Sequence, residues 1–274
     1  MAGFLGQPFN TFWKRIVQFT DSDNEGVATN PKILSDGEGN FSSLSLSDDT
    51  CIIQPRNDNT DTTLAVQNAA GNGILKVDTT NSQVKVGATL TPANTQYAYF
   101  GCNSGDPTNA GMVADTHYAI PFTIAGFGGT IANFAMGSST SSSFNDTNPA
   151  TSLTISATAM DIVTTYWYVM DNITIDAVKW LHGADAATGD STAAHLMAYT
   201  VDTANGSTGG DLSNGVVVAD SSTITNAGYE QVYYNQMTVQ SADVDAGKII
   251  LFTFAADTVN SDFSINATVK YHIR

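Results

Sequence analysis

The side chains most able to perform acid–base chemistry or to bind a metal in this 274-residue chain are its four histidines. His117, His182, His195 and His272 lie far apart, and none has a second His or Cys at the spacing of a zinc site. A Ser-His-Asp triad can assemble from distant positions, and His195 with Asp202 is one combination that the sequence offers. Because Ser and Asp are abundant, chance supplies such combinations, and we expect ordinary strand or loop histidines.

Carboxylates and nucleophile motifs give no stronger indication of catalysis. Glu25, Glu38 and Glu230 are the only glutamates, and none lies in an apolar segment of the kind that favours a protonated catalytic acid. The chain contains no Gly-x-Ser-x-Gly, His-Glu-x-x-His, Gly-x4-Gly-Lys-Ser/Thr or Cys-x-x-Cys motif. The sequence therefore predicts a protein that is not an enzyme and that uses no cofactor.

One string copies the start of a calcium-binding loop, namely Asp21-x-Asp23-x-Glu25-Gly26. Position 12 of that loop would be Lys32, where a bidentate Glu is required, so the pattern argues against an EF-hand. Calcium bound by an acidic surface loop such as Asp185–Asp190 stays open as an alternative, and no dedicated metal site is expected.

The balance of charge limits the partners. The chain has 10 Lys and Arg against 26 Asp and Glu, a formal net charge of −16, and a field of that sign repels nucleic acid and anionic lipid. From Thr91 onward the only basic residues are Lys179, Lys248, Lys270 and Arg274. We therefore expect no nucleic-acid partner, and we expect any anionic partner to meet the N-terminal part.

The cysteines and the N-terminus bear on the compartment of assembly. Cys51 and Cys102 fall in segments that look structurally separate, so we expect two free thiols rather than a disulfide. The basic pair Lys14-Arg15 follows the first apolar residues, which reverses the order in a signal peptide. No segment approaches the ~20 apolar residues of a membrane span. We expect assembly in a cytoplasm, without membrane insertion.

Residues 1–20 form the first expected element, a short amphipathic helix. Its apolar residues recur at three- and four-residue spacing beside a basic pair. Two interpretations stay open, namely a terminus that packs on its own domain and an anchor peptide that docks into a larger assembly. The residues of the proposed anchor are Phe9, Phe12, Trp13, Lys14, Arg15 and Ile16.

Residues 21–90 read as a slender β module. Three short apolar pairs alternate with polar residues between turn-forming Asn, Gly and Asp, the pattern of strand–turn–strand structure. One chain built this way cannot bury enough apolar area to offset its ordering entropy, whereas several intertwined chains can. We therefore predict an oligomeric β-stalk whose core residues are Leu64, Val66, Leu75, Val77, Val84 and Val86.

Residues 91–149 are expected to form a transition or neck, with strands at Gln96–Gly101 and Thr123–Phe127. Residues 150–274 show short alternating strands separated by turn-rich breaks and no helix-length periodic segment. The fold class is therefore all-β, with a C-terminal antiparallel, jelly-roll-like sandwich as a head. The expected head strands are Leu153–Ala157, Val163–Met170, Ile173–Leu181, Ala194–Val201, Gly215–Ala219, Val232–Val239, Lys248–Ala255 and Phe263–Ile273.

A neutral surface rich in Thr, Asn and Ser suits carbohydrate, because its hydroxyl and amide groups match sugar hydroxyls and aromatic faces stack on sugar rings. Strand alternation sends about half of the aromatic side chains into the core. The pairs of equal strand parity that would face a ligand are Tyr166 with Tyr168 and Tyr229 with Tyr233.

The segment from Leu64 to Gly87 resembles the repeat in the stalks of bacteriophage tail fibres and related trimeric adhesins. Residues 150–274 resemble, more loosely, the jelly-roll heads of phage fibres, head fibres and capsid decoration proteins. The opening segment from Phe9 to Gln18 is similar to a virion-anchoring leader. The resemblance implies a homotrimer on the virion surface, held to other virion proteins by its N-terminal segment.

Two functions from different classes follow. The chain is expected to be either a host-attachment fibre or spike whose head contacts a cell-surface glycan or protein, or a capsid decoration or head-fibre protein bound to the shell. A spike depolymerase would require a clustered carboxylate pair that the sequence does not display. The copy number per particle separates the first two, because a decoration protein matches the shell subunits in number.

Overall fold

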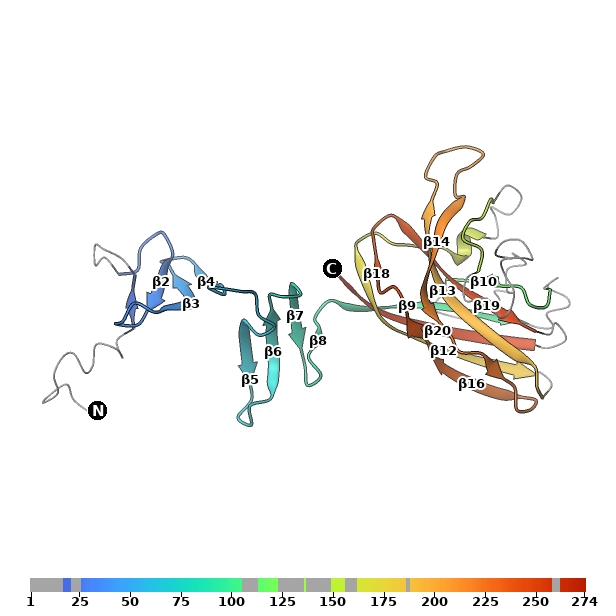
Figure 1. Ribbon diagram of the computed structural model, residues 1–274, viewed down its shortest axis with the longest axis horizontal. Helices are drawn as coiled ribbons and strands as arrows, with labels where there is room; N and C mark the ends of the chain where they lie inside the picture. The colour runs from blue at the N-terminus through green and yellow to red at the C-terminus, as the bar shows by residue number, and fades with distance from the viewer. Residues whose placement is uncertain are drawn as a thin grey trace, which may run out of the picture. The chain divides into compact units, whose positions relative to one another are not determined.

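The structure is a computed structural model that divides into two compact units, Met1–Ala93 and Asn94–Arg274, which we call unit 1 and unit 2 (Figure 1). Nearly all of its regular structure is β-strand, and every strand pair is antiparallel, which confirms the predicted all-β class. The residues that the structure describes are 17–20, 26–104, 113–122, 136, 149–155, 162–185, 188–257 and 262–274.

Unit 2 contains two antiparallel sheets, whose strands run from green to red in Figure 1. The seven-stranded sheet consists of β10 (Tyr118–Ile120), β11 (Trp167–Tyr168), β13 (Ser191–Val201), β14 (Leu212–Asp220), β15 (Ile224–Thr225), β17 (Thr238–Val239) and β19 (Lys248–Ala256). The five-stranded sheet consists of β9 (Thr95–Ser104), β12 (Ile173–Asp185), β16 (Gln231–Gln236), β18 (Asp243–Val244) and β20 (Asp262–Ile273).

The order of the strands defines a jelly roll. Without the two-residue strands, the sheets run β10-β19-β13-β14 and β16-β12-β20-β9. If these eight strands are numbered along the chain, the two orders become 2-7-4-5 and 6-3-8-1, the arrangement of two interlocked Greek keys. The chain enters and leaves unit 2 at one end, where Asn94 Nδ2 donates to the carbonyl of Ile273.

The core of unit 2 lies between the two sheets. Alternation sends Trp180 on β12, Phe100 on β9 and Phe252 on β19 inward, and all three are almost completely buried. The ring of Phe252 lies 6.0 Å from that of Phe100 and 6.0 Å from that of Trp180, so one cluster joins both sheets. A smaller cluster around Tyr199 packs on the other side of β13 and β19.

Unit 1 contains two four-stranded sheets. The first consists of β1 (Gln18–Phe19), β2 (Lys32–Ser35), β3 (Phe41–Leu46) and β4 (Cys51–Ile53). The second consists of β5 (Leu64–Gln67), β6 (Gly73–Asp78), β7 (Gln83–Val86) and β8 (Thr91–Pro92). Among the described residues, every buried hydrophobic side chain belongs to unit 2. The buried side chains described in unit 1 are the polar Ser35 and Asp78.

Several elements differ from the sequence prediction. β9 and β10 are strands of the two unit 2 sheets and not a separate neck, because β9 pairs along its length with β20. The expected strand at Val163–Met170 is a 3₁₀ turn (Val163–Thr165) followed by the short β11. The expected strand at Val232–Val239 divides between the two sheets as β16 and β17. The expected strand at Thr123–Phe127 and residues 156 and 157 lie outside the described residues.

We expect Phe252→Ala to lower the free energy of unfolding of unit 2 by about 3–5 kcal/mol, because it removes a fully buried ring that packs on both sheets. Urea unfolding of the full chain, followed by tryptophan fluorescence, measures the change. Tyr229→Ala is the matched control, since that side chain is 65% exposed and should change stability by no more than about 0.5 kcal/mol. Equal effects of the two substitutions would contradict this core.

Candidate functional site

The six residues predicted for the stalk core come together on one face of the β5–β8 sheet. The strand register places Leu64 opposite Val77 and Val77 opposite Val84. A parallel row places Val66 opposite Leu75 and Leu75 opposite Val86. The sheet therefore carries two adjacent rows of three aliphatic side chains, as the two-residue alternation of the sequence predicts.

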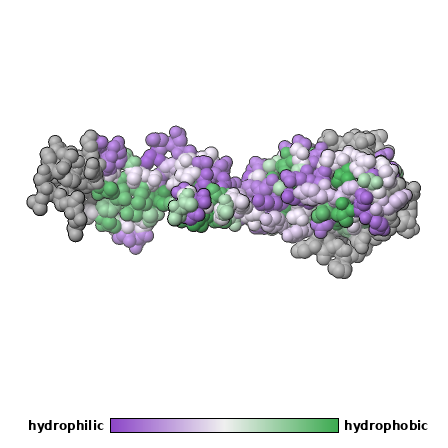
Figure 2. All heavy atoms as spheres, turned by 90° about the horizontal axis from the view of Figure 1, so that it is seen from below, coloured by the Kyte–Doolittle hydropathy of each residue, from purple (hydrophilic) through white to green (hydrophobic). Residues whose placement is uncertain are grey.

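Unit 1 leaves much of this apolar face open to solvent, although the Leu90 side chain lies against Gly73 at its edge. Val66, Val84 and Val86 are 48, 44 and 40% exposed, and no described residue of the face reaches the buried class. Hydrophobic residues, coloured green in Figure 2, gather over unit 1 in that view, whereas the visible described surface of unit 2 is mostly white and purple. We use the name apolar stalk face for the six aliphatic residues of the β5–β8 sheet, Leu64, Val66, Leu75, Val77, Val84 and Val86.

The opposite face of the same sheet is polar and satisfied within the chain. Lys85 Nζ donates to Asp78 at 2.7 Å, and Lys76 Nζ donates to Asp61 at 3.1 Å. The hydrogen bond from Lys85, with others from Asn81, lowers the pKa of Asp78 well below its ordinary value. The two faces therefore differ. The charged groups of the polar face have partners within the chain, whereas the apolar face lacks a covering layer.

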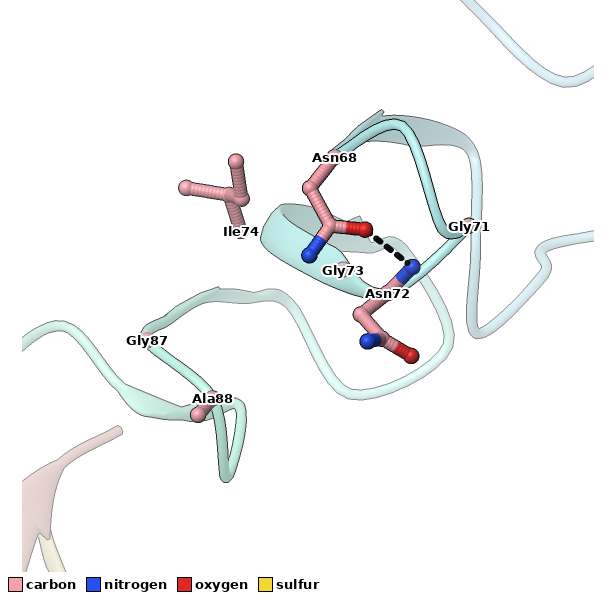
Figure 3. Close-up of a pocket in the computed structure, with 7 residues that line it drawn as sticks. All are labelled: Asn68, Gly71, Asn72, Gly73, Ile74, Gly87 and Ala88. Atoms are coloured by element: carbon pink, nitrogen blue, oxygen red, sulfur yellow. Dashed lines mark hydrogen bonds between the residues drawn. The ribbon is translucent and has the colours of Figure 1, made fainter.

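An open hollow of about 620 Å³ lies on this sheet beside the turn that joins β5 to β6 (Figure 3). Asn68 Oδ1 accepts hydrogen bonds from the backbone amides of Ala70 and Asn72, and Gly71 takes the left-handed φ of +82° that closes the turn. The hollow is lined by glycine, alanine, asparagine and isoleucine residues. Its lining offers no acid, base or nucleophile for catalysis.

The aromatic residues predicted to face a ligand do not behave as pairs. Tyr168 is exposed and lines a hollow of about 230 Å³, but Tyr166 donates its hydroxyl to the Gly210 carbonyl and packs against the Tyr199 cluster. Tyr229 is exposed, whereas Tyr233 is half-buried. The ring of Tyr233 stacks on His182 at 5.1 Å. Each predicted pair therefore has one exposed member and one that is half-buried by contacts within unit 2.

The histidines are structural in their surroundings. His195 Nε2 lies 2.9 Å from Asp220 Oδ1, not beside Asp202, which accepts a hydrogen bond from the Ala204 amide. The imidazole of His195 is buried, so a substrate cannot reach it. His272 Nδ1 lies 2.9 Å from Asp176 Oδ1. Within the described ranges, no three His, Cys, Asp or Glu side chains gather as a metal would require.

Three further predictions concern the proposed anchor, the calcium-like string and the two cysteines. Residues 1–16, with the proposed anchor side chains Phe9, Phe12, Trp13, Lys14, Arg15 and Ile16, lie outside the described residues. The same holds for residues 21–25 of the calcium-like string. Cys51 is exposed and Cys102 buried, and both are free thiols as predicted; burial raises the pKa of Cys102 to about 12.

Sequence reasoning missed the outer face of the five-stranded sheet. Parity places Tyr97 and Tyr99 of β9, Lys270 of β20, Lys179 of β12 and Tyr234 of β16 on the side away from the core. Each of these residues alternates in sequence with a buried neighbour, which is the signal that could have identified them. Their common surface appears only when the four strands are paired.

The sequence matches no protein-family model, and no curated protein is similar to it at a significant level. No helix among the described residues is both long enough and apolar enough to cross a membrane. The geometry of the apolar stalk face and of the unit 2 surface therefore carries the functional argument.

The buried His182 predicts a pH-dependent stability. Burial lowers the pKa of His182 to about 4, whereas an unfolded histidine titrates near 6.5. Between these values the unfolded state binds more protons, so stability falls as the pH drops from 6.5 towards 4. We expect His182 to account for a loss of about 2 kcal/mol between pH 8 and pH 5.

Urea unfolding of the full chain at the two pH values measures this loss. His182→Gln should reduce the difference between pH 8 and pH 5 by about 2 kcal/mol, whatever its effect at pH 8. An unchanged pH difference in the variant would contradict the assignment to His182.

Proposed function

We propose that this chain is a subunit of a homotrimeric appendage on a bacteriophage particle, a fibre or spike that attaches to the host surface through unit 2. The observation that carries the proposal is the apolar stalk face, a continuous aliphatic surface without a covering layer in the described part of its own chain. The resemblance of residues 64–87 to fibre stalks supports the same assignment.

The apolar stalk face requires a partner for energetic reasons. A sheet of strands two to six residues long is marginal in water unless one face is covered. Covering a half-exposed valine or leucine contributes on the order of 1 kcal/mol, and six such side chains on each chain contribute together. That gain offsets the entropy cost of ordering the strands. The isolated sheet lacks this gain, so its own contacts do not offset the same cost.

The partner that fits is another copy of this chain. The face is aliphatic throughout, so copies that bring it to a common axis bury the same surface on each subunit, as symmetric oligomers do. The polar face, with its Lys85–Asp78 and Lys76–Asp61 pairs, then points to solvent. The number three rests on the resemblance to the shafts of trimeric fibres.

The attachment role of unit 2 is supported by its buried two-sheet core and its surface chemistry. Exposed tyrosines accompany hydroxyl and amide side chains on a core that is independent of unit 1. A capsid decoration or head-fibre protein is the alternative outcome. Counting copies per particle tests it, since a count comparable to the shell subunits would replace attachment by decoration.

The trimer yields a direct test by multi-angle light scattering at micromolar concentration. We expect the full chain to be a trimer and Val84→Asp to be a monomer, because the substitution places a charge in the aliphatic contact. Val216→Asp is the matched control, since that valine is 50% exposed on β14 of unit 2 and should leave the trimer intact. A monomeric wild-type chain, or a trimeric Val84→Asp variant, would sink the proposal.

The proposed anchor has its own test. Deleting residues 1–20 should leave a folded, soluble trimer that no longer joins the particle, because Phe9, Phe12, Trp13 and Ile16 supply the apolar contact and Lys14 and Arg15 suit an acidic partner surface. Particle incorporation of the truncated and full chains is compared after purification. Normal incorporation, or loss of folding, would contradict the anchor.

A further inference from the structure

The outer face of the five-stranded sheet combines features that the rest of this acidic protein lacks. Lys179 of β12 lies opposite Thr268 of β20, and Lys270 follows two residues later on the same strand. Diagonal neighbours of this kind lie about 7–8 Å apart on one face of a sheet. The register therefore places two lysines as diagonal neighbours on one face, although 91 positions separate them in the chain.

Neither lysine is neutralised by the described part of the chain. No described carboxylate forms an ion pair with Lys179 or Lys270, and Lys179 Nζ lies 5.9 Å from the centre of the Tyr234 ring. The other basic residues of unit 2 are engaged. Arg274 pairs with Asp243 and Asp245, and Lys248 donates to Thr200.

The strands around the two lysines are almost free of acidic residues. β9 and β16 contain none, β20 contains none after Asp262, and β12 contains none between Asp176 and Asp185. β18, which pairs with the start of β12, contributes Asp243, and that carboxylate is bound to Arg274. Asp176, at the end of the face, is bound to His272. In a chain of net charge −16, this face is a local site where an anion meets attraction rather than repulsion.

Tyrosines stand on both sides of the lysines. Tyr97 lies directly opposite Lys270 and is 55% exposed, Tyr99 lies opposite Thr268, and Tyr234 on the far side is 57% exposed. Thr268, Asn266 and Gln236 add hydroxyl and amide groups to the same face. The face is open, which suits an extended ligand.

We propose that this outer face binds an acidic polysaccharide, through carboxylates that meet Lys179 and Lys270 and sugar rings that stack on Tyr97, Tyr99 and Tyr234. This inference rests on the proposed attachment function and names its ligand class. Carboxylates form charge-assisted hydrogen bonds with ammonium groups, and pyranose faces stack on tyrosine rings. A densely charged nucleic-acid backbone is disfavoured by the net charge of the whole chain, whereas a glycan with spaced carboxylates tolerates it.

The test uses the full chain and immobilised polygalacturonate, with neutral dextran as the uncharged comparison. We expect the wild-type protein to bind polygalacturonate in a salt-dependent manner and dextran far more weakly. Lys179→Gln with Lys270→Gln should weaken binding roughly five- to thirtyfold. Tyr97→Ala with Tyr234→Ala should weaken binding at high salt as well, because stacking does not depend on charge.

A charge-matched control separates the site from the net charge of the protein. Lys76→Gln with Lys248→Gln removes the same two charges elsewhere and should leave polygalacturonate binding within about twofold of the wild type. The tryptophan-fluorescence unfolding midpoint confirms that each variant is folded. Equal losses in the two double variants, or equal binding of dextran and polygalacturonate, would overturn the inference.

Three further outcomes separate this inference from the proposed function. If the Lys179/Lys270 variant loses the trimer, the face is a contact between copies and the glycan site is wrong. If it loses polygalacturonate but still adsorbs to host cells, or if the face captures an acidic protein instead, attachment stands and the acidic-glycan ligand fails. A monomeric wild-type chain that binds polygalacturonate through these lysines would refute the trimer and leave the glycan site standing.

Discussion

The constraint on which the rest of this structure depends is that the described part of unit 1 has no hydrophobic core. Its sheets expose aliphatic side chains that a folded chain ordinarily covers, and the rows through Val77 and Leu75 run unbroken across three strands. A hydrophobic surface of this regularity needs a covering layer, and the described chain does not supply one. The proposed oligomer would supply that layer from the surface already present.

Unit 2 solves the same problem internally. Two sheets in jelly-roll order bury Trp180, Phe252 and Phe100 between them, and no second chain is needed for that core. Under the proposed function, this contrast gives the two units different tasks. Unit 2, with its own core, would present a defined outer surface, and unit 1 would join the copies into one assembly.

The glycan site proposed on the outer face of the five-stranded sheet differs from an expectation drawn from composition. Sparse basic residues after Thr91 argued that an anionic partner would meet the N-terminal part. Pairing of β12 with β20 brings Lys179 and Lys270 together as diagonal neighbours, while the nearby Asp243 is bound to Arg274. A site for an anion thus depends on local geometry and not on the net charge of the chain.

Local patterns determined the all-β class, most strand positions in unit 2 and the composition of the apolar stalk face, because a period of two fixes which side chains share a face. The sequence alone did not place β9 in the sandwich, pair His195 with Asp220 or divide Tyr166 from Tyr168. Those outcomes depend on register between strands that are distant in the chain, as with Tyr97 and Lys270. Register is set by how the whole core packs, and the sequence of a single strand does not specify which strand pairs with it.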